Sequence, residues 1–279
     1  VAGFIACLLM GMFSGVSLGA EKVLMMATTT STDNTGLLDY LAPAFTKTTG
    51  IDLRWTAVGT GKALKMGENC DVDVLLVHAP AAEKKFVDAG FGTKRRELMY
   101  NDFVIIGPAP DPAGIKGLPI GKAMTGIQKS KALFVSRGDN SGTNKKEILL
   151  WKNAGMAVPD KDPWYIQAGQ GMLATIQIAE QRNGYTMTDR GTYIKYSHNS
   201  SRKIGTGTLA PKPALKVIVE GDTILLNQYS AIAINTGNCP EAKFELAMTF
   251  SDWMASSEAQ QMIKDFRLLG QQLFTPNAK

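Results

Sequence analysis

Residues 23–36 read VLMMATTTSTDNTG, a short apolar run that is followed at once by a series of hydroxyl, carboxyl and amide side chains. The apolar run has the length of a buried strand. We expect a helix to follow, because Leu37, Leu41 and Phe45 recur at helical spacing before Gly50. A strand that leads through a polar loop into a helix is the repeating unit of α/β proteins, and this stretch therefore sets the expected fold class.

The same alternation continues along the chain. Further strands are expected at 51–58, 73–77, 103–106, 132–135, 164–166 and 230–235, and further helices at 144–153, 172–182 and 243–266. A stretch rich in proline and glycine, residues 107–119, separates these elements into two sets. We therefore expect an α/β protein with a largely parallel sheet and two lobes.

The composition is that of an ordinary globular protein. Of 279 residues, 44% are hydrophobic and 20% are charged, and the net charge is +5. The lysines and arginines are scattered along the chain and do not form the basic stripe of a nucleic-acid-binding protein. No nucleic-acid partner is therefore expected.

The first nineteen residues, VAGFIACLLMGMFSGVSLG, carry no charge and end in small side chains. This pattern indicates a secretory signal peptide whose positively charged leading part is missing, with a retained N-terminal anchor as the alternative. Removal of residues 1–19 would leave Cys70 and Cys239 in an oxidising compartment. The two cysteines either form a disulfide or stay as thiols, because a sequence does not say how close their Cα atoms lie.

Four junctions between an expected strand and an expected helix are rich in hydroxyls and glycines: residues 28–32, 59–62, 136–143 and 168–171. A helix start offers unpaired N–H groups and the positive end of the helix dipole, and glycine lets a ligand approach the backbone. Arg137 adds a cationic fork and Lys62 a second positive charge. Such residues also serve as plain helix caps and turns. Four such junctions, at the strand ends where α/β proteins bind ligands, nevertheless predict an anion site.

Motifs for other chemistries are incomplete. The turn at 59–62 lacks the earlier glycine and the hydroxyl residue of a P-loop, and residues 169–174 lack the acidic partner of a dinucleotide site. His78 and His198 have no partner at metal-ligand spacing. We therefore expect no catalytic residue, no metal cation site and no cofactor.

Four motifs in this order resemble those of the tungstate-binding proteins of the TupA type, the extracytoplasmic receptors of ABC importers. They are TTTSTDNTG at 28–36, DVLLVHAP at 73–80, SRGDNSGT at 136–143 and TDRGTY at 188–193, and the resemblance extends over residues 20–279. It implies a type II periplasmic-binding-protein fold, in which two lobes are joined by two crossing segments. Lobe I would comprise residues 20–107 and 230–279 and lobe II residues 108–229, with the crossings near 103–108 and 229–235.

By the same resemblance the ligand is a tetrahedral oxyanion, tungstate, with molybdate as an alternative of nearly the same size and charge. An unprotonated dianion needs donors only, whereas hydrogen phosphate also needs an acceptor. Two roles are open for Asp139: accepting such a proton, or capping the next helix and orienting Arg137. The residues expected to hold the ligand are Thr28, Thr29, Ser31, Thr60, Gly61 and Lys62 from lobe I and Arg137, Ser141, Gly142 and Thr143 from lobe II.

A receptor of this kind is expected to be a periplasmic monomer that closes by hinge motion and delivers its ligand to a membrane permease with its ATPase. One alternative is a receptor of the same fold for molybdate, phosphate or sulfate. Alternatives from other classes are an enzyme for a small phosphorylated or carboxylated metabolite, and an adhesion protein that uses the tripeptide at 137–139.

Overall fold

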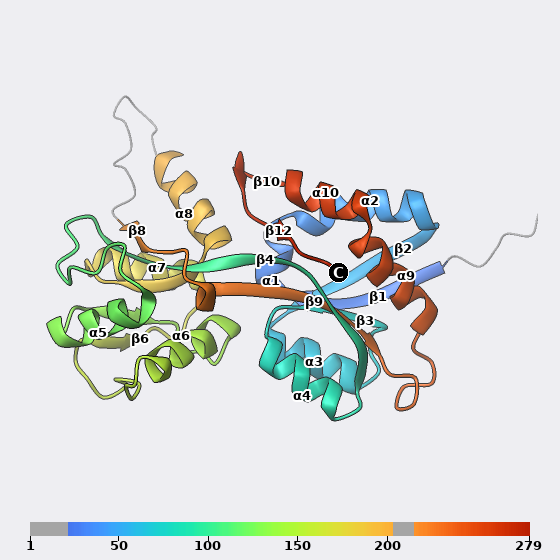
Figure 1. Cartoon of the computed structure of the whole chain (residues 1–279), viewed down its shortest axis with the longest axis horizontal. Coiled ribbons are helices and arrows are strands. Elements are labelled where there is room, and N and C mark those ends of the chain that lie inside the picture. The colour runs from blue at the N-terminus through green and yellow to red at the C-terminus, as the bar shows by residue number, and fades with distance from the viewer. Residues whose placement is uncertain (1–21, 203–214) are drawn as a thin grey trace, which may run out of the picture.

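The computed structural model describes residues 22–202 and 215–279. The expected signal peptide at 1–19 lies outside these residues. Two groups of helices and strands lie end to end along the long axis of the molecule, and the strands β4 (Gly92–Pro108) and β9 (Leu226–Ile234) run from one group into the other (Figure 1).

The first group contains a mixed sheet with the strand order β12-β4-β9-β3-β1-β2. Its remaining strands are β1 (Lys22–Thr29), β2 (Ile51–Val58), β3 (Val74–Val77) and β12 (Thr275–Pro276). β1 is parallel to β2 and β3, whereas β9 is antiparallel to β3 and to β4. The prediction of a largely parallel sheet is wrong for the pairs that β9 and β4 form, which are all antiparallel in this sheet. The reason is that β4 leads the chain from the first group to the second and β9 leads it back.

Helices cover both faces of this sheet (Figure 1). They are α1 (Thr30–Asp33), α2 (Leu37–Thr49), α3 (Thr60–Glu68), α4 (Pro80–Asp88), α9 (Phe244–Ala255) and α10 (Ser257–Asp265). Phe45 of α2 meets Phe250 and Trp253 of α9 edge to face, with ring centroids 5.5 and 5.4 Å apart. Truncation of such a buried ring to alanine costs about 3–5 kcal/mol, so this contact fixes the C-terminal helices on the first group.

The long helix expected at 243–266 is two helices. α9 ends at Ala255, and the Ser256 hydroxyl accepts a hydrogen bond from the Ala259 backbone N–H at 3.2 Å, which caps the start of α10. The apolar spacing alone did not reveal this break, because both helices bury a face against the same sheet.

The second group contains the parallel pair β5 (Phe134–Ser136) and β6 (Tyr165–Gln167). Two strands absent from the expected set, β7 (Thr186–Asp189) and β8 (Leu215–Val219), pair antiparallel with β4. The core includes Phe134, Trp151 and Tyr165, whose rings contact one another. The helices of this group are α5 (Ile120–Ser130), α6 (Gly142–Asn153), α7 (Met172–Gln181) and α8 (Arg190–Arg202), and short elements elsewhere are η1 (Thr223–Leu225), β10 (Arg267–Leu268) and β11 (Gln271–Gln272).

The pairing of β4 marks where the chain passes between the groups. As far as Asp102, β4 pairs with β9, and from Phe103 it pairs with β7. The first four residues of β9, 226–229, still belong to the first sheet. β4 is thus one continuous strand that pairs in both groups, whereas β9, among the described strands, pairs with β3 and β4 only. The lobe boundaries at 107 and 229 stay a prediction.

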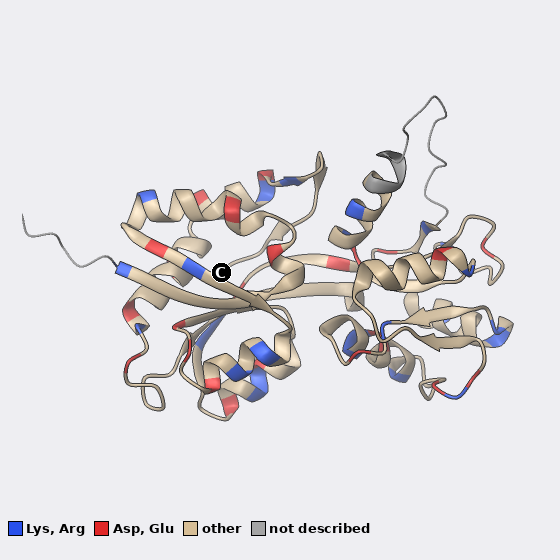
Figure 2. Cartoon of the chain, turned by 180° about the vertical axis from the view of Figure 1, so that it is seen from behind, with Lys and Arg blue, Asp and Glu red and all other residues tan. Residues whose placement is uncertain are grey.

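Cys70 and Cys239 form a disulfide, with Cα atoms 5.4 Å apart. It joins the turn before β3 to the loop after β9. In the described part of the chain, no helix combines the length and the apolar character needed to cross a membrane. Basic and acidic residues are scattered over both groups (Figure 2), in keeping with the scattered charges of the sequence.

Candidate functional site

The first expected site element lies at the end of β1. Thr29 caps α1: its hydroxyl oxygen accepts the Thr32 backbone N–H at 3.2 Å. The same oxygen lies 3.0 Å from Ser31 Oγ and 2.7 Å from Thr32 Oγ1. Thr29 and Thr32 are buried, whereas Ser31 is half-buried. This cluster therefore presents Ser31 outward and keeps the two threonine hydroxyls behind it.

Thr28, which the sequence analysis placed among the ligand residues, points away from solvent. Its side chain has no exposed surface, and its hydroxyl donates to the Leu76 carbonyl at 2.8 Å. A hydroxyl carries a single hydrogen, so this bond between β1 and β3 uses the only one that Thr28 can donate.

His78 is a site residue that sequence reasoning missed. It follows β3, the strand beside β1, and its Nε2 lies 2.9 Å from Thr29 Oγ1 and 3.1 Å from Ser31 Oγ. Its Nδ1 lies 3.0 Å from Asn227 Oδ1, and its ring stacks on Tyr229 with centroids 4.7 Å apart. The sequence signal was its place at a strand end, the same signal that pointed to Thr29.

A polar chain supports His78 from the crossing strands. Asn227 donates to Asn101 Oδ1 at 2.8 Å and lies 3.3 Å from the Tyr229 hydroxyl. Burial raises the pKa of Tyr229, so its hydroxyl stays protonated. The imidazole is thus held by residues of β4 and β9, the two strands that link the groups.

The second expected site element is the loop between β5 and α6. Arg137 Nη2 donates to Asp139 Oδ2 at 2.5 Å, and the backbone N–H of Ser141 donates to Asp139 Oδ1 at 3.1 Å. Burial alone would raise the pKa of Asp139, but the bonds from Ser141 and the charge of Arg137 hold that pKa below its usual value. Asp139 is therefore ionised, orients Arg137, and accepts a hydrogen bond at each of its oxygens.

Arg137 has a buried donor without a partner in the described part of the chain. Its Nε is buried and has no hydrogen-bond partner among the described residues. Native proteins rarely leave a buried donor unpaired, so an unpaired guanidinium nitrogen needs an explanation.

A buried carboxylate supports this loop from below. Glu147 of α6 accepts hydrogen bonds from the Ser136 hydroxyl, from the Tyr165 hydroxyl at 2.6 Å and from Trp151 Nε1 at 2.8 Å. Burial raises the pKa of Glu147, while these donors act in the opposite direction. Ser136 Oγ in turn accepts the Gly138 backbone N–H at 3.2 Å, which fixes the loop residue after Arg137.

Gly138 itself cannot be replaced without strain. Its φ is +60°, and a Cβ built there would lie 2.7 Å from Gln167 Cβ. The following helix start is capped by Ser141, whose hydroxyl accepts the Asn144 N–H at 3.3 Å. Thr143 is buried in the first turn of α6.

The two site elements meet at Gly142. A Cβ on Gly142 would lie 3.7 Å from Thr60 Oγ1 and 4.0 Å from His78 Cε1. The start of α6 thus lies against the start of α3 and the end of β3, on the opposite lobe. Gly61 and Lys62, also at the start of α3, are exposed.

A cavity of about 490 Å³ opens beside this meeting point. His78 and Gly142 form part of its lining, and Lys85, Lys145 and Lys146 line it as well. Positive charge around the cavity would attract an anion toward the site.

The 188–193 motif has a structural role at the crossing. Asp189 accepts the Thr192 backbone N–H at 2.8 Å and the Thr192 hydroxyl at 2.7 Å, which caps α8. Arg190 pairs with Asp102 at 2.6 and 2.5 Å and with Glu220 at 2.7 Å. The motif therefore braces α8 against β4 at the point where β4 changes partner.

The arrangement combines neutral donors, a helix start and one fixed guanidinium, which together suit an oxyanion. Among the described residues, no group of three histidine, cysteine, aspartate or glutamate side chains could hold a metal ion.

Comparison with known proteins gives one family match and several close relatives. The PBP superfamily domain matches residues 18–258. The tungstate-binding protein TupA of Campylobacter jejuni is 50% identical over 249 residues, which cover 89% of this chain and 89% of that protein.

Two solved structures are also similar. The tungstate-binding protein TupA from Desulfovibrio alaskensis G20 is 64% identical with a TM-score of 0.86, over 92% of this chain and 100% of that one. The tungstate ABC transporter structure from Geobacter sulfurreducens is 44% identical with a TM-score of 0.75, over 89% of this chain and 100% of that one. These likenesses cover both lobes and the crossing strands.

Proposed function

The chain belongs to the TupA family of tungstate-binding proteins within the PBP superfamily, and on that premise we propose that it binds tungstate between its two lobes. The expected type II binding-protein fold and the resemblance to this family are confirmed. The protein is a receptor that serves an ABC importer, so a membrane permease with its ATPase takes up the ligand. We place this receptor in the periplasm, as a monomer.

The observation that carries the site proposal is the unpaired Nε of Arg137. A guanidinium with one buried, unused N–H next to a helix start is complete only when an acceptor lies against it. An oxyanion oxygen supplies that acceptor, and Asp139 keeps the guanidinium plane in place.

The remaining donors come from both sides of the cleft. We assign the Ser141–Gly142–Thr143 start of α6 to lobe II, and Ser31 and Thr60 to lobe I. Gly61 and Lys62 are exposed at the start of α3, and we assign to Lys62 a long-range attraction for the anion. Thr29 supports Ser31 and does not itself face the ligand.

The state of Asp139 favours a ligand without a proton. A hydrogen phosphate ion would need an acceptor in the cleft. Each Asp139 oxygen already accepts one hydrogen bond from its own loop and has a further lone pair, and we propose that neither oxygen is turned toward the ligand. A buried proton donor without an acceptor lowers affinity strongly, so the site discriminates against phosphate. Tungstate and molybdate carry no proton at neutral pH and need donors only.

Isothermal titration with tungstate, molybdate, sulfate and phosphate tests this function. We expect sub-micromolar binding of tungstate, competition by molybdate and no heat from phosphate. Preferential binding of phosphate would overturn the proposal and would make Asp139 a ligand residue. Turnover of a phosphate ester by the purified protein would instead favour an enzyme.

A further inference from the structure

Both nitrogens of the His78 ring have polar partners, although His78 is not one of the residues proposed to contact the ligand. Nε2 lies 2.9 Å from Thr29 Oγ1 and 3.1 Å from Ser31 Oγ, and Nδ1 lies 3.0 Å from Asn227 Oδ1. A neutral imidazole has one donor and one acceptor nitrogen, so its tautomer decides which hydrogen each neighbour can give.

The crossing strands settle the tautomer. Asn227 directs its amide nitrogen toward Asn101 Oδ1 at 2.8 Å, which leaves Asn227 Oδ1 facing His78 Nδ1. An amide oxygen only accepts, so Nδ1 carries the hydrogen and Nε2 of the neutral ring is an acceptor.

The acceptor faces two hydroxyls with one hydrogen each. Thr29 is nearer to Nε2 and is 3% exposed, whereas Ser31 is farther away and half-buried. When the Thr29 hydrogen points to Nε2, the two lone pairs of Thr29 Oγ1 are filled by the Thr32 N–H at 3.2 Å and by the Thr32 hydroxyl, whose oxygen lies 2.7 Å away. The Ser31 hydrogen then remains for a group in the cleft.

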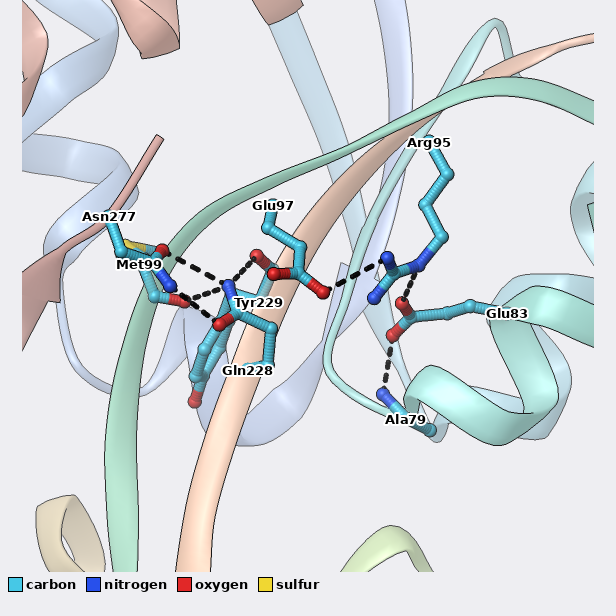
Figure 3. Close-up of polar contacts among 8 residues, drawn as sticks. All are labelled: Ala79, Glu83, Arg95, Glu97, Met99, Gln228, Tyr229 and Asn277. Carbon is cyan, nitrogen blue, oxygen red and sulfur yellow. Dashed lines mark hydrogen bonds and ion pairs between the residues drawn. The ribbon is translucent and has the colours of Figure 1, made fainter. Parts of the chain in front are cut away.

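The ring has little freedom to move. It stacks on Tyr229, and the next backbone N–H, that of Ala79, donates to Glu83 Oε1 at 2.5 Å. Glu83 is itself fully buried and paired with Arg95 at 2.8 Å, so the turn after β3 is anchored to β4 (Figure 3).

The residue after Asn227 is anchored in the same way. Gln228 donates to the Met99 carbonyl at 2.9 Å and contacts Asn277 (Figure 3). The turn that carries His78 and the part of β9 that carries its partner Asn227 are thus both anchored to β4. The ring also reaches the other lobe, since its Cε1 lies 4.0 Å from the position of a Gly142 Cβ.

We propose that His78 is the positioning residue that selects the hydroxyl donors of lobe I: it accepts the Thr29 hydroxyl hydrogen and leaves the Ser31 hydroxyl to donate to the bound oxyanion. This inference rests on the proposed binding of an oxyanion in the cleft.

The charge of the His78 ring depends on pH. Burial lowers the pKa of His78, whereas the Asp189 carboxylate raises it, and the net effect keeps the ring neutral in the empty protein. Lys85, Lys145 and Lys146 line the same cavity as His78 and bring positive charge to that side of the ring.

A bound dianion reverses this balance. It attracts a proton to Nε2, and the imidazolium can donate to Thr29 while the Ser31 hydrogen still points to the ligand. Tungstate affinity should therefore rise as the pH falls from about 8 to about 6, by at most about tenfold per pH unit for one proton.

Two substitutions separate the role of each nitrogen. In His78→Asn the amide can replace Nδ1 against Asn227 but has no acceptor near Nε2. In His78→Gln the longer amide can place an oxygen near Nε2. His198→Gln, at the other histidine of the chain, is the matched control.

The measurement is the tungstate Kd by isothermal titration at about pH 8 and about pH 6. At the higher pH we expect His78→Asn to bind about tenfold more weakly than the wild type, and His78→Gln to stay within about threefold of it. Both variants should lose the pH dependence, and His198→Gln should keep it. Equal weakening by both variants at the higher pH would overturn the acceptor role, and so would an unchanged slope in His78→Gln.

Failure of this inference differs from failure of the proposed function. Wild-type protein that binds tungstate with the same Kd at both pH values contradicts the role of His78 alone. Wild-type protein that binds no tungstate at either pH contradicts the receptor assignment.

Discussion

The two strand ends that meet at the cleft are built from different chemistry. The end of β1 gathers neutral hydroxyls, and the buried Thr29 oxygen lies within 3.0 Å of two neighbouring hydroxyl oxygens. The end of β5 carries the charge of Arg137, held by Asp139 and by a loop that rests on buried Glu147. At the end of β1 the hydroxyls form hydrogen bonds with one another, whereas at the end of β5 the buried Nε of Arg137 has no hydrogen-bond partner among the described residues.

The difference indicates separate contributions to binding. We expect the Arg137 guanidinium to contribute most of the attraction for a dianion, because charge-assisted bonds are about twice as strong as neutral ones. We expect the hydroxyl side to contribute less binding energy and to determine which hydroxyl hydrogens point toward the ligand.

Substitution of Arg137 should have the largest effect. Arg137→Gln removes the charge and the unpaired Nε, and should weaken tungstate binding by about 2–4 kcal/mol. Isothermal titration measures the change, and Arg182→Gln, an exposed arginine of the same lobe, is the control. Unchanged affinity of Arg137→Gln would move the site away from this loop.

Substitution of Glu147 should act through the loop. Glu147→Gln places an amide against three donors, so one buried donor loses its acceptor, and the free energy of unfolding should fall by about 1–3 kcal/mol. Denaturant unfolding measures this, with exposed Glu241→Gln as the control. Full stability with full affinity would show that Glu147 does not hold the loop.

Two substitutions on the hydroxyl side should differ from each other. Ser31→Ala should weaken tungstate binding by about 1 kcal/mol, since one neutral hydrogen bond is lost. Thr28→Val should leave the tungstate Kd unchanged, because the Thr28 hydroxyl already donates its hydrogen to the Leu76 carbonyl. A larger loss of affinity in Thr28→Val than in Ser31→Ala would restore Thr28 to the ligand set.

The smallest effect concerns the stability of the empty protein. Because the pKa of His78 is lowered on folding, the unfolded chain takes up this proton first as the pH falls below about 6.5. His78 therefore costs stability at acidic pH, by less than about 1.4 kcal/mol per pH unit. Urea unfolding of the wild type and His78→Gln at two pH values should show that the variant loses less stability on acidification. A greater loss in the variant would contradict the depressed pKa.

Local patterns in the sequence predicted the turns and helix starts of the candidate site that one segment builds by itself. The loop at 136–143 is an example, since Gly138, Asp139 and Ser141 act on their own neighbours as turn former and caps. Strand and helix positions followed from apolar spacing for the same reason.

Parts of the site that depend on strand pairing were not predictable. The Thr28 hydroxyl donates to the carbonyl of Leu76, 48 positions away in the sequence. His78 forms a hydrogen bond with Asn227, 149 positions away. Both contacts depend on which strand lies beside β3, and neither hydrophobic pattern nor motif spacing encodes that neighbour. The mixed direction of the sheet was not predictable for the same reason, because it depends on β9 returning between β3 and β4.

A crystal structure of the protein with tungstate tests the central claim most directly. The anomalous signal of tungsten locates the ion without ambiguity. We predict an oxyanion that accepts hydrogen bonds from Arg137 Nε, Ser31 Oγ and the start of α6, with no contact to Thr28. Tungsten bound only among Lys85, Lys145 and Lys146 in the neighbouring cavity, with Arg137 Nε still unpaired, would contradict the account.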